Sequence, residues 1–307
     1  TVASNVSVVG NVVYTATEGI ANNRDNITVN AGISLISTGG GITLNAGDNL
    51  TVAVGAVVSA ATDLIINTDH GDLDGLGGNV TVAGTLTSVL GDTRITTSAG
   101  QADTLSLTGT FTSGRDFWLL TGGGNDTVTY SGTLTAKNAY LMLGRGNDTL
   151  TIQRGTISAT AGDATAGDVL FDLGDDSDTL NELTISGTVA ASRDVLIYKL
   201  PQTDFSAVVG ISQTVSLTPG NLVRVTTGNR PAVYEYIGAI VSMDLGSATY
   251  SNTLLWRETS VNPTNTGQTV VAVTGAGTLT AGRDIDIWTG GGDDSIAVAS
   301  LLKAQRD

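Results

Sequence analysis

The chain has 307 residues, and its 29 acidic and 14 basic side chains give a formal charge of −15. This acidic balance argues against nucleic-acid binding, which needs a basic surface. The absence of Cys excludes disulfides and thiolate metal sites, and the single histidine, His70, argues against His-based catalysis. No segment approaches 18 consecutive apolar residues, so we expect no membrane insertion. The chain opens at Thr1 without a charged or apolar leader, so we expect any export signal to lie outside it.

A short repeat organises most of the chain. Weak units occupy 32–44 and 47–59, and a clearer pattern, Gly-Thr-apolar-Thr, then recurs at 84–87, 109–112, 132–135 and 277–280, with looser copies at 155–158 and 187–190. Gly109, Gly132 and Gly155 are spaced 23 residues apart. Repeats of this length are typical of solenoids, in which each unit packs only on its neighbours.

Each unit contains three short runs of alternating apolar and polar residues. In 109–131 these runs are separated by Gly-, Asn- and Asp-rich stretches, a pattern that indicates three strands and three turns. We therefore predict an all-β fold, a parallel β-helix with about 23 residues per three-strand coil. Eight or nine coils would give a stack roughly 40 Å long. The alternation places five residues in one inward ladder, with Thr on the outside: Leu86, Phe111, Leu134, Ile157 and Val189.

The repeat is interrupted once, between residues 199 and 270. All four prolines lie in this interval, and short runs at 222–226, 233–237 and 254–258 indicate antiparallel strands. The predicted organisation is β-helix coils at 1–198, an inserted small β module at 199–270, and resumed β-helix at 271–307. The aromatic residues of the module could stack on sugar rings or form its core, and they are Tyr234, Tyr236, Tyr250 and Trp256.

The third-strand turns carry a chemical signal. The runs at 122–126, 144–148, 174–178 and 290–294 combine Gly with Asn and Asp, and 100–103 is a degenerate copy. Gly allows positive φ and close approach of carbonyl oxygens, and Ca²⁺ takes six to eight oxygen ligands. We predict calcium ligands at Asp103, Asn125, Asp126, Asn147, Asp148, Asp176, Asp178, Asp293 and Asp294. The alternative is that Asn and Asp cap their own turns.

Two further acidic groups occur outside these turns. Asp69, Asp72 and Asp74 lie within six residues, a spacing that suits either a calcium loop or a plain polar loop. Asp116, Asp194 and Asp284 each follow Arg, which favours an ion pair or a turn cap over a metal site.

The Gly-Asp turns resemble the nonapeptide of the RTX (repeats-in-toxin) proteins, although the first Gly is missing and the copies lie 22 or more residues apart. Together with the Asp69–Asp74 loop, they resemble the repeat arrays of giant bacterial RTX-type filamentous adhesins. The resemblance implies secretion to the bacterial cell surface, folding on meeting calcium, and service as a stalk. It also implies surface glycans or other cell-surface proteins as partners.

Two other functions remain as alternatives. Polysaccharide lyases and epimerases use β-helices, but they need basic neighbours around a unique cleft, and the chain has three Lys, with its carboxylates in repeated turns. We therefore expect no enzyme. The Thr-x-Thr strands could form a flat ice-binding face, although Thr is also an ordinary outward-facing strand residue.

Overall fold

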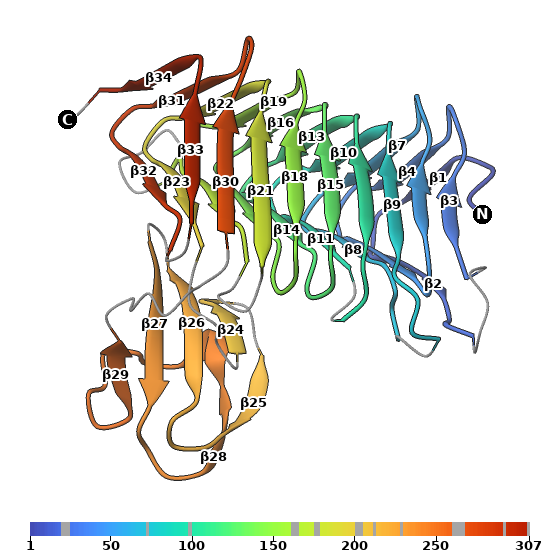
Figure 1. The fold of residues 1–307 in the computed structure, drawn as a ribbon. Helices are drawn as coiled ribbons and strands as arrows, with labels where there is room; N and C mark the ends of the chain where they lie inside the picture. Colours follow the sequence, from blue (N-terminus) through green and yellow to red (C-terminus); the bar gives the residue numbers. More distant parts are fainter. Residues whose placement is uncertain are drawn as a thin grey trace.

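The computed structural model describes residues 1–19, 25–71, 74–97, 100–160, 166–174, 179–199, 205–210, 213–227, 230–259, 268–290 and 293–305. Three long parallel sheets run side by side along the molecule and enclose a common core (Figure 1). Successive strands of the chain enter the three sheets in turn, so that each coil contributes one strand to each sheet. This arrangement confirms the predicted all-β parallel β-helix.

Sheet 1 has 10 strands, and sheets 2 and 3 have 9 each among the described residues. Sheet 1 contains β1 (Val6–Val8), β4 (Ser34–Ser37), β7 (Val57–Ala60), β10 (Thr85–Ser88), β13 (Thr110–Ser113), β16 (Thr133–Ala136), β19 (Thr156–Ala159), β22 (Thr188–Ala191), β31 (Thr278–Ala281) and β34 (Leu301–Ala304). Sheet 2 contains β2 (Val12–Ala16), β5 (Ile42–Ala46), β8 (Leu64–Asn67), β11 (Thr93–Thr96), β14 (Asp116–Leu120), β17 (Asn138–Met142), β20 (Val169–Asp172), β23 (Val195–Tyr198) and β32 (Ile285–Trp288). Sheet 3 contains β3 (Ile27–Val29), β6 (Leu50–Val52), β9 (Asn79–Val82), β12 (Thr104–Leu107), β15 (Thr127–Tyr130), β18 (Thr149–Ile152), β21 (Leu180–Ile185), β30 (Gln268–Val273) and β33 (Ser295–Val298).

The core is a stack of like residues at like positions. The predicted inward ladder is confirmed, because its five members are buried and pair in register from β10 to β22. Phe111 packs edge-on against Phe117 of the same coil, with ring centroids 5.8 Å apart. Threonines 110 and 112 on either side of Phe111 are exposed, as the alternation predicts. Burial of one face of each strand therefore fixes the register of the whole solenoid.

A separate β unit follows β23 (Figure 1). One sheet contains β24 (Phe205–Val208), β26 (Leu222–Thr227), β27 (Arg230–Tyr236) and β29 (Trp256–Thr259), and β25 (Thr214–Leu217) pairs with β28 (Val241–Asp244) before the short helix η1 (Leu245–Ser247). β27 is antiparallel to both β26 and β29, as predicted. β24 instead runs parallel to β26, because the chain passes through β25 between them and so makes a crossover.

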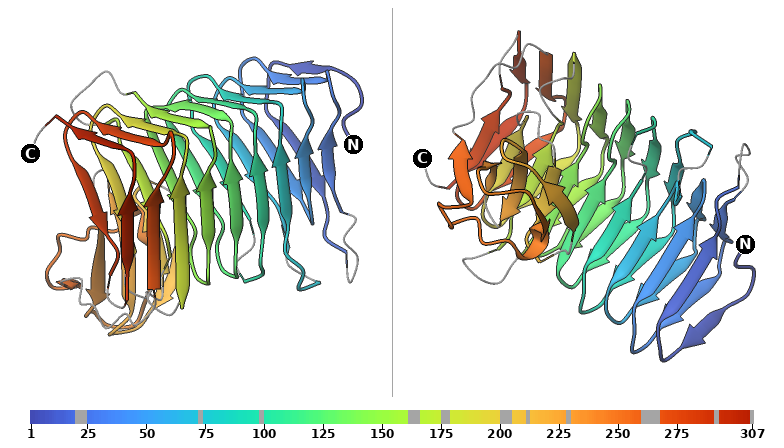
Figure 2. Two further views of the ribbon diagram at one scale, coloured as in Figure 1. Left: turned by 45° about the horizontal axis from the view of Figure 1, so that its top comes forward. Right: turned by 90° about the horizontal axis from the view of Figure 1, so that it is seen from below.

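This unit packs on the outside of sheet 2 (Figures 1 and 2). The strands β14, β17, β20 and β23 are buried on both faces, whereas β8 and β11 alternate between buried and partly exposed residues. Arg224 of β26 donates a hydrogen bond from Nη1 to Oδ2 of Asp172 in β20 at 2.7 Å, and both side chains are buried. Gly210 of the unit lines the same surface pocket as Trp118 of β14. The unit therefore covers the second half of sheet 2.

Candidate calcium-binding edge

The described metal-ligand candidates of the sequence lie in the turns that lead from sheet 2 to sheet 3. We call this line of turns the acidic edge, and its described parts are 17–19, 25–26, 47–49, 68–71, 74–78, 97, 100–103, 121–126, 143–148, 173–174, 179 and the turn 289–290 with 293–294. The β unit between β23 and β30 leaves the solenoid at this same edge. Two features predicted from separate motifs, the Gly-Asp turns and the Asp69–Asp74 loop, thus share one side of the molecule.

Aspartates at the end of these turns form a ladder that joins one coil to the next. The backbone N–H of Gly78 donates to Oδ1 of Asp103 at 2.6 Å, and that of Asp103 donates to Oδ1 of Asp126 at 2.8 Å. The N–H of Asp126 donates to Oδ1 of Asp148, and that of Asp148 to the amide oxygen of Asn181, both at 2.8 Å. The three aspartates are each about 1% exposed. Each one therefore caps a buried backbone donor of the preceding coil.

Burial places these carboxylates in an unfavourable environment when they are ionised. Burial raises the pKa of Asp126 to about 7, and the charge of Asp103 adds to this rise. The Thr121 hydroxyl and the Asp103 N–H act in the opposite direction. The Thr121 hydroxyl lies near enough to lower the pKa of Asp126, but its proton is donated to the carbonyl oxygen of Leu143 at 2.6 Å, so among the described residues Oδ2 of Asp126 is buried without a hydrogen-bond partner. An ionised Asp126 is thus an acceptor that a cation would stabilise.

The glycines of the turns allow adjacent coils to stack in backbone contact. Gly122, Gly124, Gly144 and Gly146 have φ between +88° and +122°. A Cβ added to Gly144 would lie 1.6 Å from the carbonyl oxygen of Gly122, which accepts the N–H of Arg145 at 2.9 Å. The expected positive φ is therefore present, and the close stacking is a second reason for Gly at these positions.

The remaining predicted ligands of the Gly-Asp turns are distributed along the edge. Asn125 and Asn147 are exposed, and Oδ1 of Asn125 accepts the N–H of Asn147 at 2.9 Å. Asp293 is exposed, whereas Oδ1 of Asp294 accepts the N–H of Thr269 at 2.9 Å. Asp294 thus repeats the ladder contact in the last coil, with Asn181 and Thr269 at the intervening positions. Asp72, Asp176 and Asp178 lie outside the described residues.

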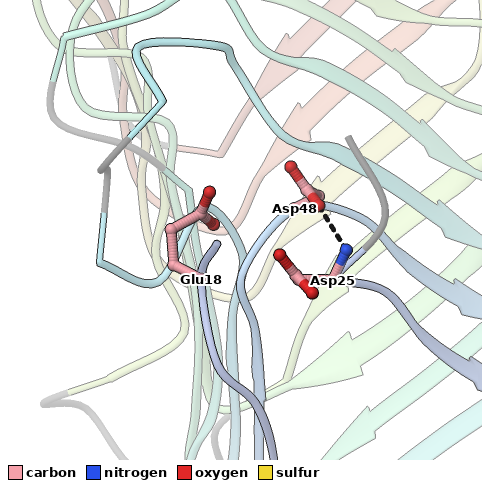
Figure 3. Close-up of side chains that lie close together, drawn as sticks. All are labelled: Glu18, Asp25 and Asp48. Atoms are coloured by element: carbon pink, nitrogen blue, oxygen red, sulfur yellow. Dashed lines mark hydrogen bonds between the residues drawn. The ribbon is translucent and has the colours of Figure 1, made fainter. Parts of the chain in front are cut away.

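A group of carboxylates at the start of the acidic edge was not predicted from the sequence, and we call it the first acidic cluster. Glu18, Asp25 and Asp48 each place one oxygen within 4.8 Å of the others (Figure 3). Burial raises the pKa of Glu18 to about 7, and so do the charges of Asp48, Asp74, Asp69 and Asp25, in that order. The predicted Asp69–Asp74 loop therefore contributes to a cluster that begins in the first coil.

A sequence signal for this cluster exists. Asp-Asn-apolar-Thr-Val occurs at 25–29 and again at 48–52, so that Asp25 and Asp48 precede β3 and β6 as Asp103 precedes β12. Glu18 lies outside this Asp-Asn-apolar-Thr-Val repeat, so no pattern in the sequence places it beside Asp25 and Asp48.

The Arg-Asp turns lie on a different edge, between sheets 1 and 2. Arg193 forms a buried ion pair with Asp168, and Arg283 pairs with Asp194. Arg115 lies 3.4 Å from Asp92 through Nε. A local ion pair was expected at these turns, and Arg283 does lie 3.3 Å from Asp284, but the closest ion pairs join each Arg to the Asp of the preceding coil.

The aromatic residues of the β unit pack against one another. Tyr236 and Trp256 are 1% and 2% exposed, with ring centroids 5.1 Å apart. Tyr250 packs on both Trp256 and Tyr234, and these two tyrosines are partly exposed. The hydroxyl of Tyr236 donates to the carbonyl oxygen of Ala239 at 2.6 Å. Tyr236 and Trp256 thus form the core of the unit, and only Tyr234 and Tyr250 reach its surface.

No family model, no curated protein and no solved structure matches the chain. Within the part of the chain that the structure describes, no helix has the length and apolar character needed to cross a membrane.

Proposed function

We propose that the chain is a structural and adhesive segment of a secreted bacterial cell-surface protein, a β-solenoid stalk stabilised by calcium along its acidic edge. The observation that carries this proposal is the repetition of Asp103, Asp126 and Asp148 at equivalent positions of consecutive coils. A catalytic site occurs once in a protein, whereas a carboxylate that recurs in three consecutive coils serves the stack of coils. The proposed role is therefore not enzymatic.

Bound calcium would stabilise the ionised form of the buried aspartates. Stacked carboxylates at a coil spacing of about 4.8 Å repel by about 3.5 kcal/mol at an effective dielectric constant of 20. A cation shared between coils turns this repulsion into attraction. The glycine-rich turns beside Asp126 and Asp148 supply carbonyl oxygens, which are the ligands that Ca²⁺ accepts. Thermal unfolding of the full chain in chelator and in millimolar calcium tests this part, and identical unfolding curves would contradict it.

The β unit is the proposed adhesive surface. It carries exposed apolar side chains on the loops that flank β27 and β29, among them Ile240 at 75% and Leu254 at 82% exposure. The Ile237 N–H donates to the carbonyl oxygen of Leu255 at 2.9 Å, which brings these loops together. Exposed apolar groups of this kind are typical of protein-binding surfaces, and Tyr234 and Tyr250 would suit a glycan.

Binding of the labelled chain to bacterial and host cells, and to a glycan array, tests the adhesive role. We expect an Ile240→Ser, Leu254→Ser variant to lose binding to protein partners. Val9→Ser is the matched control, because Val9 is 78% exposed on the solenoid itself. Equal binding of the double variant and the wild type would exclude these loops, and absence of any binding by the wild type would exclude the adhesive role.

Ice binding is a second candidate function, favoured by one observation. A threonine occupies the same outward position of sheet 1 in six successive strands, from Thr85 through 110, 133, 156 and 188 to 278. Sheet 3 also carries threonines 127, 149 and 184 on its outer positions, so two faces are rich in Thr. Thermal hysteresis in the presence of calcium would support ice binding, and its absence would exclude it.

A further inference from the structure

Glu18 is the residue that sets the first acidic cluster apart from a surface patch of carboxylates. The residue is only 7% exposed, and within the described part of the chain neither carboxylate oxygen has a hydrogen-bond partner. Figure 3 shows Glu18 beside Asp25 and Asp48, which come from the turns before β3 and β6. A buried, ionisable group with no donor in reach requires either a proton or a cation.

Two glycines of the neighbouring coils leave the space that Glu18 occupies. A Cβ added to Gly47 would lie 2.7 Å from Oε2 of Glu18 and 2.8 Å from Cβ of Asp25. A Cβ on Gly71, where φ is +125°, would lie 3.0 Å from Cβ of Glu18. The second and third coils thus pack closely against Glu18 of the first coil, and only glycine at these two positions leaves room for its side chain.

The other carboxylates retain oxygens for a ligand. Oδ2 of Asp25 accepts the N–H of Gly19 at 2.8 Å, and Oδ2 of Asp48 accepts the N–H of Asp25, so each keeps its other oxygen. Oδ1 of Asp74 accepts the N–H of Leu76 at 2.9 Å, while its Oδ2 is buried without a hydrogen-bond partner. The cluster therefore offers three carboxylates from two consecutive coils, and Asp74 of the third coil adds negative charge nearby.

The all-carboxylate chemistry of the cluster suits Ca²⁺, which is bound by oxygen ligands. Oxygens bound to Ca²⁺ lie about 2.4 Å from the ion, so two ligands on opposite sides are about 4.8 Å apart. The ligand atoms of Glu18, Asp25 and Asp48 all lie within this distance of one another, so one Ca²⁺ ion could contact all three carboxylates. Mg²⁺ needs ligands at about 2.1 Å, and Zn²⁺ favours His and Cys, which the cluster lacks among its described members.

We propose that Glu18, Asp25 and Asp48 form a Ca²⁺ site that fastens the first coil of the solenoid to the second. This site lies on the acidic edge and so rests on the proposed function, but it is separate from the Gly-Asp turns and acts on the first two coils. With the ion bound, Glu18 and Asp25 are held to Asp48 by charge, and without it the three carboxylates repel one another.

Calorimetric titration of the full, chelator-treated chain with CaCl₂ tests the proposal. Glu18→Gln removes one charge without changing the side-chain shape. Asp48→Asn keeps an acceptor for the Asp25 N–H, as Asn181 shows for the Asp148 N–H. Asp63→Asn is the matched control, because Asp63 also caps a neighbouring coil, through the Asp92 N–H at 2.9 Å, but on the edge between sheets 1 and 2. Asp126→Asn reports on the Gly-Asp turns.

We expect Glu18→Gln and Asp48→Asn each to weaken one calcium-binding event by at least about tenfold. The control Asp63→Asn should bind calcium as the wild type does. Amide hydrogen exchange of 25–29 should slow on adding calcium in the wild type and remain unchanged in Glu18→Gln. In chelator both variants should melt at or above the wild-type temperature, because repulsion is relieved. Wild-type binding by Glu18→Gln, or no calcium binding by the wild type, would overturn the proposal. Loss of binding in Asp126→Asn alone would support the Gly-Asp turns and overturn this site.

Discussion

Asp126→Asn should make the calcium-free protein more stable at neutral pH. The pKa of Asp126 rises from 3.8 to about 7 on folding, so the folded state binds a proton that the unfolded state has lost. Stability therefore falls as pH rises from about 4 to about 7, and is constant above. The pKa change corresponds to about 4 kcal/mol. Exposed neighbours such as Gly122 and Asn125 let solvent screen the charge of Asp126, so the expected loss of folding free energy is about 2 kcal/mol.

The assay is urea unfolding in chelator across this pH window. The difference in free energy of unfolding between Asp126→Asn and the wild type should change by about 2 kcal/mol in favour of the variant from pH 4 to pH 7. Asn retains an acceptor for the Asp103 N–H, so the cap survives. Asp63→Asn, at an exposed turn, should show no such change. A difference for Asp126→Asn that does not vary with pH would refute the reasoning.

Three further predictions concern the solenoid and the β unit. Phe111→Ala should lower the free energy of unfolding by about 3–5 kcal/mol in urea, because the ring is fully buried, whereas exposed Thr112→Ala should change it by less than about 0.5 kcal/mol. Gly144→Ala should lower the melting temperature well below that of Gly32→Ala: both have positive φ, but only at Gly144 would the new Cβ meet a carbonyl oxygen, so equal effects would argue against stacked turns. Arg224→Ala should cost about 3–5 kcal/mol because it leaves Asp172 buried without its ion pair, and the double Arg224→Leu, Asp172→Leu variant should recover part of this. Limited proteolysis between β23 and β30 should be faster in Arg224→Ala, because the β unit is then held less firmly on sheet 2. An unaltered cleavage rate in Arg224→Ala would contradict the docking role of this ion pair.

The repeat predicted the solenoid because its physical basis is local. Alternation around Phe111 and Leu134 sets the buried face, and the 23-residue spacing sets the coil. The position of the Gly-Asp turns on one edge follows from the same periodicity. The antiparallel strands of the β unit were also recognisable, but the parallel pairing of β24 was not, since it depends on a crossover rather than on a pattern.

The first acidic cluster shows the limit of pattern analysis. Asp25 and Asp48 repeat at the coil spacing, but Glu18 belongs to no repeat and is seen beside them only in the folded structure. The capping role of Asp103 and Asp126 could not be predicted from the sequence either, because the N–H groups that they cap belong to the preceding coil. Docking of the β unit on sheet 2 depends on Arg224 and Asp172, which are 52 residues apart and belong to no motif.

The proposed role of the chain depends on stabilisation of its β-solenoid by calcium. The most direct test is thermal unfolding of the full chain, followed by circular dichroism at neutral pH, during a calcium titration from chelator to millimolar concentration. Calcium at about 100 times its dissociation constant should add about 2.7 kcal/mol per site, so the midpoint should rise by several degrees and continue to rise with concentration. Superimposable unfolding curves in chelator and in millimolar calcium would contradict the claim and leave the solenoid without its proposed ion.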